Sequence, residues 1–96
     1  MTSLTRIQNT LQLQKKHLQR KYKIRALGVF GSYSRGEQNE KSDIDIVVEF
    51  DEPIGIEFVD LATELENILG EKVELVSRAG IKTRYLRYVE EDVVYV

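Results

Sequence analysis

The feature that most constrains the fold is a pair of short strand patterns separated by a turn and a polar loop. An apolar run at residues 24–30 stops at Gly31, and residues 36–42 are polar. Residues 43–48 then read Asp-Ile-Asp-Ile-Val-Val, in which apolar side chains at first alternate with acidic ones. Alternation with a period of two is typical of a strand that buries one face. These patterns predict two strands joined by a turn and a short loop.

Helical periodicity predicts the elements on either side of this pair. Apolar residues recur at intervals of three and four in two stretches, and Gly70 stands where the second stretch stops. Glycine is common just past the C-terminus of a helix. The expected elements are helices over residues 3–21, 56–69 and 81–89, a strand over residues 72–76 and an extended segment over residues 93–96. This order predicts an α/β (α+β) fold, with a small mixed β-sheet and flanking helices. A length of 96 residues leaves room for a single domain, residues 1–96.

The residue types that are missing exclude several classes of protein. The chain contains no Cys and a single His, His17. A disulfide framework, a thiolate metal site, a Cys nucleophile and a multi-histidine metal site are therefore excluded. The apolar stretches are far shorter than the ~20 residues that span a bilayer, and the first residues do not lead into the apolar segment of a signal peptide. We expect a cytoplasmic protein that does not contact a membrane.

Charge is distributed unevenly along the chain. Residues 1–25 contain seven basic residues and no acid, whereas residues 37–74 contain thirteen acids and two lysines. Each run is either a solvated face or a binding surface, with a phosphate-bearing or acidic partner at the basic end and divalent cations at the acidic end. Nucleic-acid binding through the basic run is the weaker interpretation. Tyr22 is the only aromatic residue among the basic ones, and the acidic middle would repel a long polyanion.

Two short motifs lie where the predicted strands meet. Gly31-Ser32 ends the first strand, and Asp43 and Asp45 open the second on one face of it. Two carboxylates this close repel, and Mg²⁺ relieves that cost because it prefers one or two carboxylates plus substrate phosphates. Gly31 lets a phosphate approach the backbone, and Ser32 offers a hydroxyl and an N–H at a helix N-terminus. Taken separately the motifs describe an ordinary turn and a solvated strand face. Together they favour phosphoryl or nucleotidyl transfer.

The two motifs also carry a resemblance to a known family. The stretch Gly-Ser-Tyr-Ser-Arg-Gly at residues 31–36, with Ser-Asp-Ile-Asp at residues 42–45, resembles the signature of the polymerase-β-type nucleotidyltransferase superfamily. The layout of the whole chain resembles its minimal nucleotidyltransferase (MNT) antitoxins, which are encoded beside HEPN-domain RNase toxins. The resemblance implies a minimal nucleotidyltransferase fold and one half of a type VII-like toxin–antitoxin pair. The implied activity is transfer of AMP from Mg-ATP to a tyrosine hydroxyl of the toxin, which silences it.

The resemblance assigns roles to the residues of the two motifs. Gly31 and Ser32 are expected to bind the β and γ phosphates of ATP. Asp43 and Asp45 are expected to ligate one or two Mg²⁺ ions and so to form the catalytic centre. ATP is then the substrate, and the HEPN-domain toxin is both acceptor and complex partner.

Two further positions leave alternatives open. Arg35 matches a family position that steadies the triphosphate, and a surface ion pair with Glu37 or Glu40 is the alternative. The family's third carboxylate is usually an Asp on the next strand, and here it falls on Glu74. Glu74 either serves as metal ligand and as the base that accepts the proton of the attacking hydroxyl, or its extra methylene misplaces the carboxylate and weakens catalysis.

Two other functions are compatible with the same motifs. Small-molecule nucleotidyltransferases share the Gly-Ser and Asp-x-Asp core, but they resemble this core plus an acceptor-binding domain, for which 96 residues leave no room. A non-catalytic antitoxin would instead neutralise its partner by docking, through the helix around residues 58–69 and the apolar C-terminal segment. Transfer of AMP to a partner protein distinguishes the enzyme from this binding module.

Overall fold

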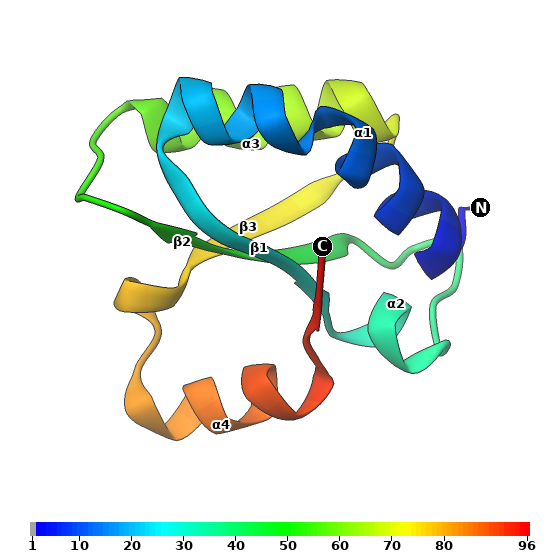
Figure 1. Ribbon diagram of the computed structural model, residues 1–96. Helices are drawn as coiled ribbons and strands as arrows, with labels where there is room; N and C mark the ends of the chain where they lie inside the picture. Colours follow the sequence, from blue (N-terminus) through cyan, green and yellow to red (C-terminus); the bar gives the residue numbers. More distant parts are fainter. Residues whose placement is uncertain (1) are drawn as a thin grey trace.

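The computed structural model describes residues 2–96 as a four-stranded sheet with helices on both faces (Figure 1). The strands lie in the order β3-β2-β1-β4. Strand β1 is antiparallel to β2 and to β4, whereas β2 and β3 are parallel. The predicted mixed sheet and α/β class are therefore confirmed. The strand bounds are Ile24–Phe30 for β1, Ile44–Phe50 for β2, Val73–Ser77 for β3 and Val94–Tyr95 for β4.

The helices form two layers that differ in how tightly they pack. Figure 1 shows α1 and α3 side by side on one face of the sheet and α4 on the other. None of the helices in residues 2–96 is long and apolar enough to cross a bilayer. The helix bounds are Leu4–Tyr22 for α1, Ser32–Arg35 for α2, Glu57–Leu69 for α3 and Thr83–Asp92 for α4, with a short 3₁₀ helix η1 at Arg78–Gly80.

The hydrophobic core lies between the sheet and the layer formed by α1 and α3. Strand β2 contributes three fully buried side chains from alternate positions, and α1 and α3 supply the facing ones. Full burial of one such side chain is worth about 1.5–3 kcal/mol. Helix α4 has no fully buried residue, so the stability of the fold comes mainly from the α1 and α3 side. The fully buried side chains of these three elements are Ile44, Ile46, Val48, Ile7, Leu11, Leu18, Leu61 and Leu65.

The other face of the sheet carries the polar residues of β2. Because side chains alternate along a strand, Asp45, Val47 and Glu49 point away from the core and toward the α4 side. Gly28 lies on this face in the middle of β1, opposite Val47 and Tyr95. The predicted carboxylates are therefore presented on the face that α4 covers.

The C-terminal segment lies directly on Gly28. A Cβ at this position would be 2.6 Å from Val93 Cγ2 and 3.1 Å from Tyr95 Cδ1. We predict that Gly28→Ala lowers the free energy of unfolding by about 1–3 kcal/mol, because an overpacked site must shift the segment. Urea unfolding measures this, and amide exchange should be faster in β4.

Gly80→Ala is the matched control for that substitution. Nothing lies within 4 Å of the position that its Cβ would take. It should change the free energy of unfolding by less than about 1 kcal/mol. Equal stabilities of the two variants would show that the C-terminal segment does not depend on the glycine.

Candidate active site

The turn that follows β1 has a backbone conformation that only glycine adopts readily. Gly31 has φ +74° and ψ −150°. It occupies the cap position of α2, and Ser32 is the first helical residue. Ser32 therefore lies at the N-terminus of this helix, as the sequence predicts, and Gly31 takes the cap position before it. The turn is held by Ser34 Oγ and Arg35 N, which donate to the Gly31 carbonyl at 2.9 and 3.2 Å.

The side chain of Tyr33 fixes this turn to the core. It is only 2% exposed and belongs to the same cluster as the buried residues of β2. A four-residue helix has little stability of its own, so the buried ring holds it against the end of β1. In the sequence, the signal of this packing role is an aromatic residue inside an otherwise small and polar motif.

The Asp45 carboxylate occupies the space where a side chain of residue 31 would lie. The β1–β2 register pairs Phe30 with Asp45, which places the carboxylate beside the turn. A Cβ at Gly31 would overlap Asp45 Oδ2 and lie 3.1 Å from its Cγ. The two predicted motifs therefore meet in direct contact.

Glu74 lies next to Asp45 on the neighbouring parallel strand. The β2–β3 register pairs these two residues. Partial burial, followed by the negative charge of Glu74, raises the pKa of Asp45 from 3.8 to about 6, and Asp43 contributes less. Asp43 itself lies directly before β2. The structure thus pairs Asp45 with Glu74, and Asp43 is a weaker electrostatic neighbour of Asp45.

Arg35 forms ion pairs on both sides of the turn. Its Nε lies 3.4 Å from Glu37 Oε2, and its Nη1 lies 2.5 Å from Asp92 Oδ2 at the end of α4. The pair with Glu37 is one of the two alternatives considered for this residue, whereas the pair with Asp92 was not anticipated. The contact with Asp92 depends on where α4 packs, and residue spacing gives no signal of that. Arg35 also lies close enough to Asp45 to oppose the rise of its pKa.

The chain matches a known protein family over most of its length. Residues 11–96 match the family model described as "Nucleotidyltransferase domain". The chain belongs to this nucleotidyltransferase family. The match includes the Gly31 turn and all three carboxylates, so the nucleotidyltransferase class implied by the motifs is confirmed.

Named relatives and solved structures show which nucleotidyltransferases this chain is similar to. Protein adenylyltransferase MntA of Thermococcus cleftensis is 42% identical over 97 residues, which cover 100% of this chain and 98% of the relative. A crystal structure of a toxin–antitoxin with AMP-PNP has a similar chain at 29% identity and a TM-score of 0.72, covering 86% of this chain and 69% of that one.

A second solved complex contains tri-AMPylated Shewanella oneidensis HEPN toxin and MNT antitoxin. The matching chain is 26% identical with a TM-score of 0.68, covering 93% of this chain and 70% of that one. These neighbours confirm the resemblance of this nucleotidyltransferase to the MNT proteins and its minimal fold.

Magnesium fits the donor set of this nucleotidyltransferase. Residues 2–96 hold no ready-made group of three or more His, Asp or Glu side chains around one point. The adjacent carboxylates of Asp45 and Glu74 still offer hard oxygen ligands, and their mutual repulsion would be relieved by a divalent cation. Magnesium is usually bound by one or two carboxylates, with substrate phosphates and water completing the shell. The site is therefore suited to bind the ion together with a nucleotide.

The carboxylates lie apart from a cavity of about 730 Å³ at the far end of β2. Phe50, Phe58 and Leu86 are among the residues that line it, and none of the three carboxylates does. Glu74 is exposed at the sheet edge, and Asp45 is only partly buried. The site therefore lies outside that cavity, between β2 and the edge strand β3.

The contact between Gly31 and Asp45 predicts a specific defect for Gly31→Ala. The new methyl group would collide with the carboxylate in addition to straining a left-handed backbone. We expect Mg²⁺-dependent binding of AMP-PNP to weaken at least about tenfold, measured by calorimetry, because the displaced carboxylate no longer holds the cation beside the phosphates.

Gly36→Ala separates the collision from the backbone strain. Gly36 has φ +71°, but nothing lies within 4 Å of where its Cβ would be. It should lose some stability through its positive φ alone and keep its affinity for AMP-PNP. An equal loss of affinity in both variants would attribute the effect to strain alone.

The raised pKa of Asp45 predicts that removing its charge stabilises the metal-free protein. The folded state holds the proton more tightly than the unfolded chain, so the charged form destabilises the fold increasingly as pH rises from about 4 to about 6. Asp45→Asn should therefore raise the melting temperature in EDTA at pH 7.5, with a much smaller gain at pH 4.5.

An exposed loop residue supplies the control for that measurement. Glu40→Gln removes one negative charge outside the site, and its effect should differ little between the two pH values. If Asp45→Asn lowered the melting temperature at pH 7.5, the repulsion between Asp45 and Glu74 would not be a cost to the fold.

Proposed function

We propose that this nucleotidyltransferase is the antitoxin of a HEPN/MNT toxin–antitoxin pair, acting as a single minimal domain over residues 1–96. It transfers AMP from Mg-ATP to a tyrosine hydroxyl of its HEPN-domain partner and so neutralises that RNase. The proposal is supported by the name of the Thermococcus relative and by solved neighbours with AMP-PNP and with an AMPylated HEPN toxin.

The observation that carries the proposal is the contact between the Gly31 turn and the Asp45 carboxylate. A turn with exposed backbone N–H groups suits phosphates, and carboxylates suit the cation that accompanies them. The close packing of Asp45 against Gly31, with Glu74 on the next strand, supports the proposal that one nucleotide contacts both the turn and the carboxylates. This arrangement places like charges side by side, so the stability of the fold does not explain it.

Each residue of the site has a defined task in this proposal. The backbone at Gly31 and the hydroxyl of Ser32 hold the β and γ phosphates, and Asp43, Asp45 and Glu74 hold one or two Mg²⁺ ions. When bound, Mg²⁺ would neutralise charge on the triphosphate and lower the pKa of the attacking hydroxyl. Arg35 can turn from its exposed ion pairs toward the same phosphates.

The proposed step is an in-line displacement at the α-phosphorus. The tyrosine oxygen of the acceptor forms the new P–O bond, and the bond to the bridging oxygen breaks so that pyrophosphate leaves. Glu74 accepts the hydroxyl proton, because it is the exposed carboxylate of the pair and lies at the edge of the sheet. The Gly31 turn retains the leaving pyrophosphate until release.

Removal of either paired carboxylate should abolish transfer while leaving the fold intact. Asp45→Asn and Glu74→Gln are each expected to lower the transfer rate at least about 10²-fold, because each removes charge at the reacting centre. The assay measures the label moved from α-labelled ATP to the HEPN-domain protein, with circular dichroism to check folding. Full activity in the double variant would refute the catalytic assignment.

Intact-mass measurement separates the enzyme from a binding antitoxin. Incubation with Mg-ATP and the HEPN-domain protein should add one or more AMP units to that protein, with Glu40→Gln as an active control. Neutralisation of the partner with no change in its mass would favour the non-catalytic binding antitoxin instead.

A further inference from the structure

The donor and acceptor sides of the site lie on opposite sides of Asp45. Strand β2 carries Asp45, the Gly31 turn follows β1 on one side, and Glu74 lies on β3 on the other. An in-line reaction needs the leaving group and the attacking oxygen on opposite sides of phosphorus. With pyrophosphate at Gly31, the acceptor must arrive from the Glu74 side. This step rests on the proposed function.

Strand β3 gives the acceptor room to approach. It ends the sheet order, so its outer edge is not paired with another strand of residues 2–96. Glu74 itself is exposed on this edge. An incoming protein that approaches Glu74 therefore contacts the neighbouring surface along β3.

A cavity of about 480 Å³ lies further along that strand, beyond Glu74. Val76 lines it and lies two residues after Glu74, which puts it on the same face about 7 Å further on. Ile81 and Tyr85 add apolar surface, and Lys82 and Arg84 add positive charge. The cavity thus combines an apolar lining with basic residues. Its residue Val76 lies two positions along β3 from the proposed base, Glu74.

The basic residues of this cavity are free to meet a partner. The ion pairs formed within residues 2–96 involve neither Lys82 nor Arg84, although the nearby Arg78 is paired with Glu49 and Glu90. The Arg84 guanidinium lies 4.9 Å from the ring centre of Tyr85, which is 52% exposed. Exposed Tyr and Arg side chains are the types that contribute most to binding at protein interfaces.

We propose that this cavity, lined by Val76, Ile81, Tyr85, Lys82 and Arg84, binds the acceptor protein beside its reactive hydroxyl. An apolar side chain of the acceptor enters the cavity, and acidic side chains next to it face Lys82 and Arg84. The acceptor recognised here is therefore an acidic protein segment. Its docking fixes the distance between the hydroxyl and Glu74.

Charge reversal tests the docking surface on its own. Lys82→Glu combined with Arg84→Glu should raise the KM for the HEPN-domain protein at least tenfold, with kcat within twofold and the KM for ATP unchanged. The control is Lys16→Glu combined with Arg20→Glu, which makes the same charge change on exposed positions of α1, on the other side of the sheet. The control should leave all three constants within twofold.

Salt dependence and conservative variants test the electrostatic part. Added NaCl should raise the wild-type KM for the HEPN-domain protein and barely change that of the reversed variant. Lys82→Arg with Arg84→Lys should keep the wild-type KM, and Tyr85→Ala should raise it at any salt concentration. A merely structural role of these residues would not produce this pattern.

Three results would overturn the proposal. Equal KM values for the reversed variant and the α1 control would show that the acceptor docks elsewhere. A raised KM for ATP in the reversed variant would assign the cavity to the nucleotide. Absence of transfer by the wild-type protein would withdraw the proposed function itself, and this result is obtained before any variant is compared.

Discussion

The contact between the Asp45 carboxylate and the backbone of Gly31 determines the geometry of the candidate active site. The antiparallel register pairs Phe30 with Asp45, so the carboxylate necessarily lies against the residue after Phe30. Only a residue without a Cβ leaves space for it, and the same residue supplies the left-handed turn that starts α2. The position of Ser32 and Arg35 then follows from the burial of Tyr33. A single steric requirement thus links strand register, turn conformation and the proposed phosphate site.

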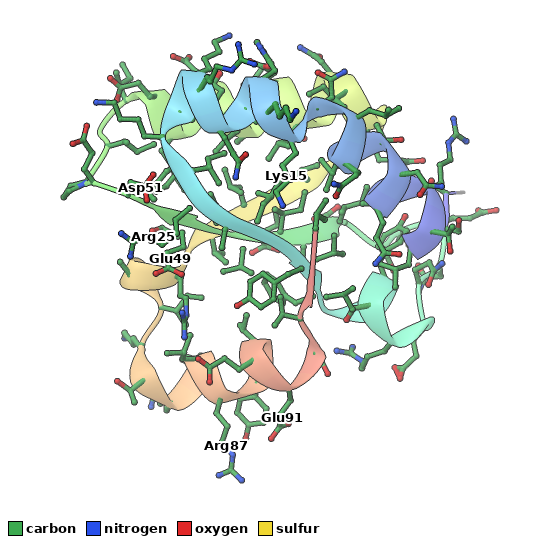
Figure 2. The ribbon with its side chains drawn as sticks, in the orientation of Figure 1. Lys15, Arg25, Glu49, Asp51, Arg87 and Glu91 are labelled. Atoms are coloured by element: carbon green, nitrogen blue, oxygen red, sulfur yellow. The ribbon has the colours of Figure 1, made fainter. Side chains whose placement is uncertain are left out.

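The two faces of the sheet divide stability from chemistry. The face toward α1 and α3 is apolar and closely packed, which permits the other face to hold adjacent carboxylates at a cost. The ion pairs of Arg25 with Asp51 and of Arg87 with Glu91 (Figure 2) are exposed and contribute little to stability. The negative charges at Asp45 and Glu74 are therefore tolerated because the core does not depend on that face.

Sequence reasoning identified the elements that local patterns encode and missed what depends on tertiary placement. The alternating side chains of β2 and the glycine after α3 predicted these two elements with nearly correct bounds. The spacing of Gly31 and Asp45 indicated that the two residues belong to one site. The cap position of α2, the 3₁₀ helix and the later end of α4 were not predicted. The ion pair between Arg35 and Asp92 joins positions 57 residues apart, and only the packing of α4 brings them together.

The family resemblance implies an Asp as the third carboxylate, and this chain has Glu74 at that position. The place of Glu74 on an edge strand gives a physical reason for the longer side chain. Strand β3 is an edge strand, and Glu74 is exposed on it, yet its charge is close enough to raise the pKa of Asp45. The extra methylene lets a side chain rooted at the edge reach inward and still rotate toward solvent. A shorter side chain would be held nearer to its own strand. This position is compatible with the proposed role of Glu74 as a base that an incoming acceptor meets at the edge of the sheet.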